Sequence, residues 1–122
     1  MKIRIKGNSI RYRLTKSEVE TLAETGYYRE ETEFPHRTFA YAIKADNGTQ
    51  ELDVDFSADT ITMYFNRDKS AAWPKNDVVG FSPEIKTSNG ITLCLLLEKD
   101  FVCMDNTAED QSDNYPNPKL AK

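Results

Sequence analysis

Residues 2–14 read KIRIKGNSIRYRL, and apolar and basic residues alternate on both sides of the Gly7-Asn8 pair. A period of two places the apolar side chains on one face of a strand and the basic side chains on the other. Gly-Asn is typical of a tight turn. The stretch therefore predicts a β-hairpin with one face for the core and one basic face, which gathers Lys2, Arg4, Lys6, Arg11 and Arg13.

A helix is expected over residues 16–25, directly after this hairpin. Thr15 and Glu18 have the spacing of a capping box, and Gly26 stands where a left-handed cap ends a helix. Val19 and Leu22 share one narrow apolar stripe with Ala23. Because so short an apolar stripe cannot sustain an isolated helix, we expect the helix to lie on the sheet that the hairpin begins.

The rest of the chain alternates apolar and polar residues in short segments, which predict strands at 27–34, 38–45, 49–57, 60–66, 78–85 and 91–98. Asn47-Gly48 is a favoured hairpin turn and is expected to join the segments 38–45 and 49–57. Short turns between consecutive strands favour an antiparallel meander. The predicted fold class is α+β, a mainly antiparallel β meander that forms a partly closed barrel, with one short helix after the first hairpin.

Two regions are expected along the chain. Residues 1–104 form a single β-rich domain. Residues 105–122 form an acidic, Pro- and Asn-containing tail with little to bury, and we expect it to be extended and able to dock on the domain.

Charge and composition narrow the classes of partner. The chain has 16 Lys and Arg against 20 Asp and Glu, a net charge of −4, so general nucleic-acid binding is not expected. No apolar run approaches the roughly 20 residues of a membrane helix, and no secretory signal is evident. Cys94 and Cys103 suit a reducing compartment, and a disulfide between them is disfavoured. The expected location is the cytoplasm.

The basic side chains of the hairpin are the first candidate site. Arg4, Arg11 and Arg13 lie on neighbouring strands, where guanidinium groups can hold a phosphate or carboxylate in bidentate fashion. The alternative is a solvated sheet face that pairs with the acidic residues Glu51, Asp53 and Asp55.

Trp73 is the second candidate. It stands beside Pro74 in a predicted loop over residues 67–77 and is expected either to anchor a protein partner or to cover the open end of the barrel. An exposed sheet edge is expected to allow a homodimer.

Catalytic and metal-binding motifs are not found in the sequence. His36 is the only histidine, the cysteines form no CxxC pair, and no phosphate-binding loop is present. We therefore expect no cofactor, no metal and no catalytic residues. The sequence favours a non-catalytic binding or protein-interaction module. The alternative is a domain that binds a small anion or phosphate ligand through the basic residues of the hairpin, with phosphoester processing as its catalytic form.

Two stretches resemble a known family. Residues 1–19, which open MKIRIKGNSIR and continue with RLTKSEV, are similar to the start of a family of small uncharacterised bacterial proteins, classed as a domain of unknown function. EKDFVC at 98–103 and DNYPNP at 113–118 resemble its C-terminal signature. The resemblance implies a bacterial, cytoplasmic protein without an established activity. It also implies that the segment 115–118 docks on the domain.

Overall fold

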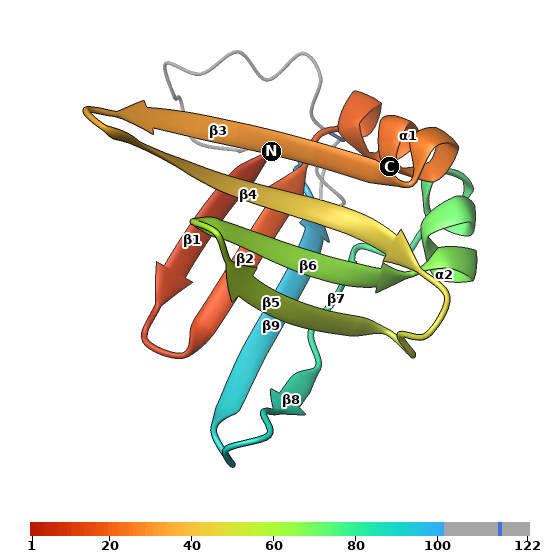
Figure 1. Ribbon diagram of the computed structural model, residues 1–122. Coiled ribbons are helices and arrows are strands. Elements are labelled where there is room, and N and C mark those ends of the chain that lie inside the picture. The colour runs from red at the N-terminus through yellow and green to blue at the C-terminus, as the bar shows by residue number, and fades with distance from the viewer. Residues whose placement is uncertain (102–114, 116–122) are drawn as a thin grey trace.

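Two β-sheets face each other in this computed structural model, which describes residues 1–101 and 115 (Figure 1). The first sheet contains β1 (Lys2–Lys6), β2 (Ser9–Leu14), β9 (Thr92–Lys99) and the short strands β7 (Gly80–Phe81) and β8 (Glu84–Lys86). The second sheet contains β3 (Tyr27–Phe34), β4 (Arg37–Asp46), β6 (Thr60–Asn66) and β5 (Leu52–Ser57) in that order. The two inner faces bury the core between them.

Both sheets follow the same pattern of pairing. The hairpins β1–β2 and β3–β4 are antiparallel, as the sequence predicts. The second strand of each hairpin then pairs in parallel with a strand from later in the chain, β9 in the first sheet and β6 in the second. The remaining strands, β7, β8 and β5, return antiparallel to those partners.

The α+β class is confirmed, whereas the antiparallel meander is wrong because each sheet contains a parallel pair. Neither sheet closes into a barrel over residues 1–101. The expected hairpin between 38–45 and 49–57 is also wrong, since β6 lies between β4 and β5. Asp46 explains this, because its carboxylate accepts hydrogen bonds from Gly48 N and Thr49 Oγ1 and holds a wider loop than a two-residue turn.

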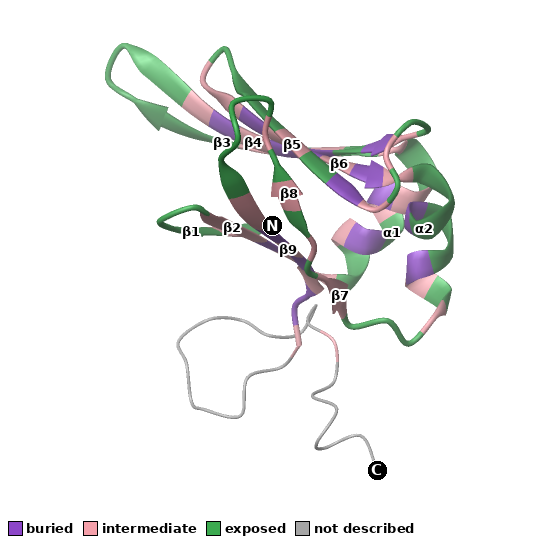
Figure 2. Cartoon of the chain, turned by 90° about the horizontal axis from the view of Figure 1, so that it is seen from below, coloured by how far each residue is buried: buried purple, intermediate pink, exposed green. Residues whose placement is uncertain are grey.

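The first helix, α1 (Lys16–Thr25), has the predicted bounds. Thr15 N donates to Glu18 Oε1 over 2.8 Å, and Gly26 adopts a left-handed conformation with φ of 76°. A second helix, α2 (Arg67–Ala72), and the 3₁₀ turn η1 (Trp73–Lys75) occupy part of the segment that was expected to be a loop. The helices cover one end of the space between the sheets, as Figure 2 shows from below.

The core contains the alternating apolar residues of both sheets. Tyr12 links the two layers, because its buried hydroxyl donates to Ile61 O over 2.8 Å. At the helical end, the rings of Phe65, Trp73 and Phe81 pack edge to face or tilted, with centroids 4.9–5.6 Å apart. Aromatic pairs at these separations stabilise a core beyond their buried area.

The tail predicted over 105–122 lies outside the described residues, with one exception, and so does Cys103. That exception is Tyr115, which lies against the end of β9. Its backbone N–H donates to Asp100 O over 2.7 Å, and its ring is 5.7 Å from that of Phe101.

Candidate functional site

The outer face of the first sheet carries the predicted basic residues. In the register of the β1–β2 hairpin, Arg4 is directly opposite Arg11, and Lys2 is directly opposite Arg13. Side chains of directly opposite residues lie on the same face of a sheet. The structure therefore brings together the predicted anion-binding residues Arg4, Arg11 and Arg13. We call this surface the basic face and define it by Lys2, Arg4, Lys6, Arg11 and Arg13.

Acidic residues near the end of β9 partly neutralise this surface. Glu98 Oε1 lies 2.7 Å from Arg11 Nε and 3.4 Å from Arg13 Nε. Asp100 is buried, and its Oδ2 lies 3.3 Å from Lys2 Nζ. No local sequence pattern indicates these partners, because they depend on the parallel pairing of β2 with β9.

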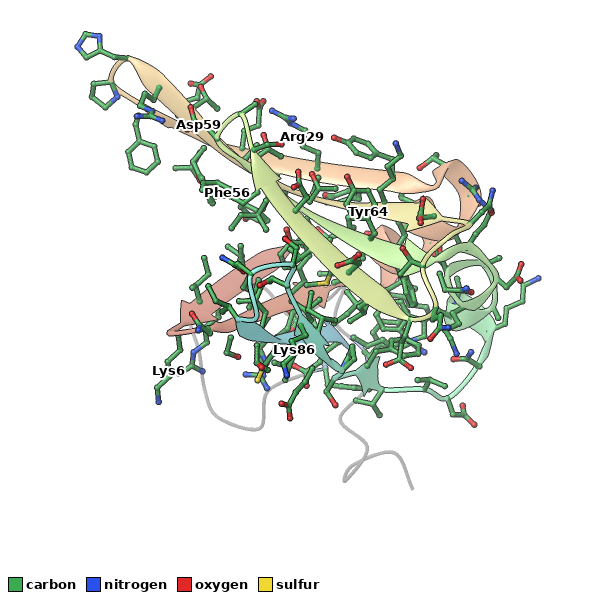
Figure 3. All side chains as sticks on the ribbon, turned by 60° about the horizontal axis from the view of Figure 1, so that its bottom comes forward. Lys6, Arg29, Phe56, Asp59, Tyr64 and Lys86 are labelled. Atoms are coloured by element: carbon green, nitrogen blue, oxygen red, sulfur yellow. The ribbon has the colours of Figure 1, made fainter. Side chains whose placement is uncertain are left out.

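The alternative pairing with Glu51, Asp53 and Asp55 is wrong. Asp53 and Asp55 lie on β5, and Glu51 directly precedes that strand. β5 is an edge strand of the second sheet, whereas the basic face lies on the outer face of the first sheet. Figure 3 shows the two layers, with Lys6 on the first sheet and Phe56 on the second.

The basic face keeps a surplus of positive charge. Among the described residues, Glu98 pairs with Arg11 and Arg13, and Asp100 pairs with Lys2. Within residues 1–101, Arg4 and Lys6 have no ion-pair partner. Like charges directly opposite each other destabilise a sheet, and this protein has a net charge of −4. An anion at this position would relieve the repulsion.

Two hollows flank the opposed pair Arg4 and Arg11. One has a volume of 180 Å³ and is also lined by Lys6, Ser9 and Leu96. The other has a volume of 240 Å³, and its remaining lining residues are Lys2, Ile3 and Arg13. Both arginines border both hollows, so they lie at the centre of the basic face.

Trp73 lies away from this surface, at the helical end of the core. Its side chain is fully buried, and Nε1 donates to Val78 O over 2.8 Å. A partner cannot reach a side chain without exposed surface. The structure thus places Trp73 where it covers the helical end of the core.

Lys99 is a buried cation beside Trp73. Its Nζ donates to Asn76 O over 2.8 Å and lies 5.0 Å from the centre of the Tyr115 ring. Burial lowers the pKa of Lys99 from its usual value. The backbone carbonyl and the aromatic rings replace part of its hydration, so we interpret Lys99 as an anchor for the segment after η1.

The described part of the chain contains few other groups that could bind a metal ion or take part in catalysis. It contains no cluster of three or more His, Cys, Asp or Glu side chains able to hold a metal ion. Cys94 is a free thiol on β9 and is half-buried. Over the same residues, the helices are too short and too polar to cross a membrane.

Comparison with protein families matches residues 1–119 to a family of unknown function, DUF7009. This confirms the resemblance to a domain of unknown function that the two sequence stretches indicated. Comparisons with curated proteins and with solved structures find no match. Since the match covers nearly the whole chain, the protein belongs to the DUF7009 family of unknown function.

Proposed function

We propose that this protein is a non-catalytic binding module whose basic face holds a small ligand that carries a phosphate or carboxylate group. The observation that supports this most is the opposed pair Arg4 and Arg11, bordered by two hollows on a face with excess positive charge. We further infer that the module acts in the cytoplasm, where a free thiol such as Cys94 persists.

The side chains differ in their expected roles. Glu98 holds Arg11 and Arg13 in place on β2 through its short ion pairs, so these two groups are ordered before a ligand arrives. Arg4 is exposed on β1 and supplies a guanidinium group that is not engaged by a carboxylate over residues 1–101. Guanidinium groups bind phosphate and carboxylate with two parallel hydrogen bonds. Ser9 and Lys6 add a hydroxyl group and an ammonium group at one hollow.

The residues of the basic face favour binding of a phosphate or carboxylate group without a chemical reaction on it. A phosphoester-processing site needs a base or nucleophile near the bound phosphate. The carboxylate nearest the central arginines, Glu98, is engaged by Arg11 and Arg13. The sole histidine, His36, lies in the turn between β3 and β4 of the other sheet.

Thermal unfolding at constant ionic strength tests this proposal, with chloride replaced stepwise by inorganic phosphate. A ligand that binds only the native state raises its stability, by about 2.7 kcal/mol at one hundred times the dissociation constant. We expect the melting temperature of the wild type to rise with phosphate and to level off as the site fills. The double substitution Arg4→Gln and Arg11→Gln should remove that rise.

Arg37→Gln is the matched control, because Arg37 is an exposed arginine at the start of β4 on the other sheet. It should leave the phosphate response unchanged. An equal response in the wild type and the double variant would overturn the proposal, and so would an equal loss in the Arg37→Gln control.

A further inference from the structure

Three rows of side chains cross the outer face of the first sheet. Each row is a pair of directly opposite residues of the β1–β2 hairpin: Lys2 with Arg13, Arg4 with Arg11, and Lys6 with Ser9. Successive rows are two residues apart along each strand. Because a strand rises about 3.4 Å per residue, neighbouring rows lie about 7 Å apart. The basic face therefore presents its cationic groups at regular intervals along the hairpin.

The two hollows of the basic face lie between these rows. The larger hollow, of 240 Å³, is lined by the first and second rows with Ile3, and the smaller hollow, of 180 Å³, by the second and third rows with Leu96. Their centres are thus about 7 Å apart along the hairpin. Arg4 and Arg11 separate the hollows and can donate to an anion on either side. Both volumes are below the roughly 300–1,000 Å³ of ordinary small-molecule sites, so each hollow suits one small anionic group.

The cationic side chains around each hollow favour phosphate over carboxylate. Arg4, Arg11 and Lys6 border the smaller hollow, and Lys2 and Arg13 join the two arginines at the larger hollow. A phosphate monoester carries about −1.5 to −2 charges at pH 7 and has three strong acceptor oxygens, whereas a carboxylate carries a single charge and two oxygens. Phosphate therefore makes fuller use of the donors that each hollow offers.

Acidic residues confine the positive charge to the hairpin. On the outer face of the sheet, Arg13 is beside Glu98 of β9. Ser9 is beside Cys94 of β9, and Cys94 is beside Glu84 of β8. A long polyanion that continued across the sheet past β2 would meet these carboxylates, and the whole chain has a net charge of −4. The basic face therefore suits a small ligand better than a polymer such as a nucleic acid.

We propose that the ligand of the basic face is a small molecule with two phosphate groups, one in each hollow, which share Arg4 and Arg11. This inference rests on the function proposed above and names the class of ligand. The bridge between the two phosphates passes over the arginine pair and spans about 7 Å. Linking two groups that bind side by side raises affinity by about 10²–10⁴ when the linker matches the distance between the sites, and a linker that is too short gives no such gain.

NMR titrations of the full chain with phosphonates at constant ionic strength test this proposal. Methylphosphonate carries one anionic group. Methylene bisphosphonate joins two such groups through one carbon, and tetramethylene bisphosphonate joins them through four carbons, which can span the two hollows. We expect tetramethylene bisphosphonate to bind at least about ten-fold more tightly than methylphosphonate, and more tightly than methylene bisphosphonate, with shifts at the amides beside both hollows.

Single substitutions test the two hollows separately. Lys6→Gln removes a cation from the smaller hollow, and Arg13→Gln removes one from the larger hollow. Each should reduce the preference for tetramethylene bisphosphonate over methylphosphonate by about three-fold or more, because one phosphate loses a charge-assisted hydrogen bond. Lys86→Gln is the matched control, since Lys86 is an exposed lysine of β8 on the same outer face and borders neither hollow (Figure 3). It should leave the preference unchanged.

The outcomes separate this inference from the proposed function. If methylphosphonate binds the basic face and tetramethylene bisphosphonate binds no more tightly, the ligand with two phosphates is overturned and the anion site stands. If none of the three phosphonates binds there, both are overturned. An equal loss of preference in Lys86→Gln would indicate general attraction to positive charge and would contradict the two hollows as the site. Tighter binding of an eight-nucleotide single strand than of tetramethylene bisphosphonate would overturn the small ligand in favour of a nucleic-acid backbone.

Discussion

Glu98→Gln should change stability and anion binding in opposite directions. In the wild type, the Glu98 carboxylate lies 2.7 Å from Arg11 Nε, and the side chains of Arg11 and Glu98 are 28% and 24% exposed. Exposed ion pairs contribute about 0.2–1 kcal/mol, whereas breaking a fully buried pair costs about 3–5 kcal/mol. The Arg11–Glu98 pair has intermediate exposure, and Arg13 lies 3.4 Å from the same carboxylate. We therefore expect Glu98→Gln to lower the free energy of unfolding by about 1–2 kcal/mol.

The same substitution removes one negative charge from beside Arg11 and Arg13 and so makes the basic face more positive by one charge. Inorganic phosphate should therefore stabilise Glu98→Gln more than it stabilises the wild type. Urea unfolding at low chloride concentration measures the loss of stability, which corresponds to a fall in melting temperature of about 3–10 °C. Titration with phosphate, followed by the melting temperature, measures the larger stabilisation by the anion.

Glu84→Gln on β8 serves as the control, because Glu84 is an exposed acid of the first sheet and forms no ion pair within residues 1–101. Glu84→Gln should change the free energy of unfolding and the stabilisation by phosphate only a little. A stability of Glu98→Gln within about 0.3 kcal/mol of the wild type would refute the assigned role of this ion pair. Weaker stabilisation of the variant than of the wild type by phosphate would refute the assigned role of the basic face.

Three further predictions follow from the backbone and from titration. Gly80→Ala should destabilise by about 1–3 kcal/mol in urea unfolding, because a Cβ there would lie 2.5 Å from Leu97 O; an unchanged midpoint would contradict this close approach of β7 to β9. Ala58→Asn should stabilise by about 0.5–1 kcal/mol, because Ala58 has φ of 51° and Asn tolerates this left-handed conformation better; a lower melting temperature would refute it. Burial next to Glu18 raises the pKa of Tyr28 to about 12 from 10.0, so the unfolded state loses this proton first and stability should fall as pH rises from 10 to 12. Tyr28→Phe should make that fall shallower in urea unfolding at pH 9–11, and an identical slope would count against the assignment.

The local elements of this fold are predictable from the sequence. Strict alternation along residues 2–14 specifies which side chains face the core, and the register places them there. Thr15, Glu18 and Gly26 mark the ends of α1 because caps are local interactions. The clustering of Arg4, Arg11 and Arg13 follows from the same alternation, since one hairpin carries all three.

The order of the strands was not predictable in the same way. A period of two fixes the face of a strand but not its neighbour, so the parallel pairs β2–β9 and β4–β6 leave no local signal. Asn47-Gly48 favours a hairpin, yet Asp46 holds a different loop through its carboxylate. The role of Glu98 depends on one of those parallel pairs and was missed for that reason. Burial of Trp73 depends on Phe65 and Phe81, which lie on two different sheets.

The most direct measurement of the proposed binding is a two-dimensional ¹⁵N–¹H NMR titration of the full chain with inorganic phosphate at constant ionic strength. We predict shifts that saturate and that are confined to the amides of β1, β2 and the adjoining part of β9, centred on Arg4 and Arg11. Shifts that increase linearly without saturation, or that centre on the second sheet, would contradict an anion site on the basic face.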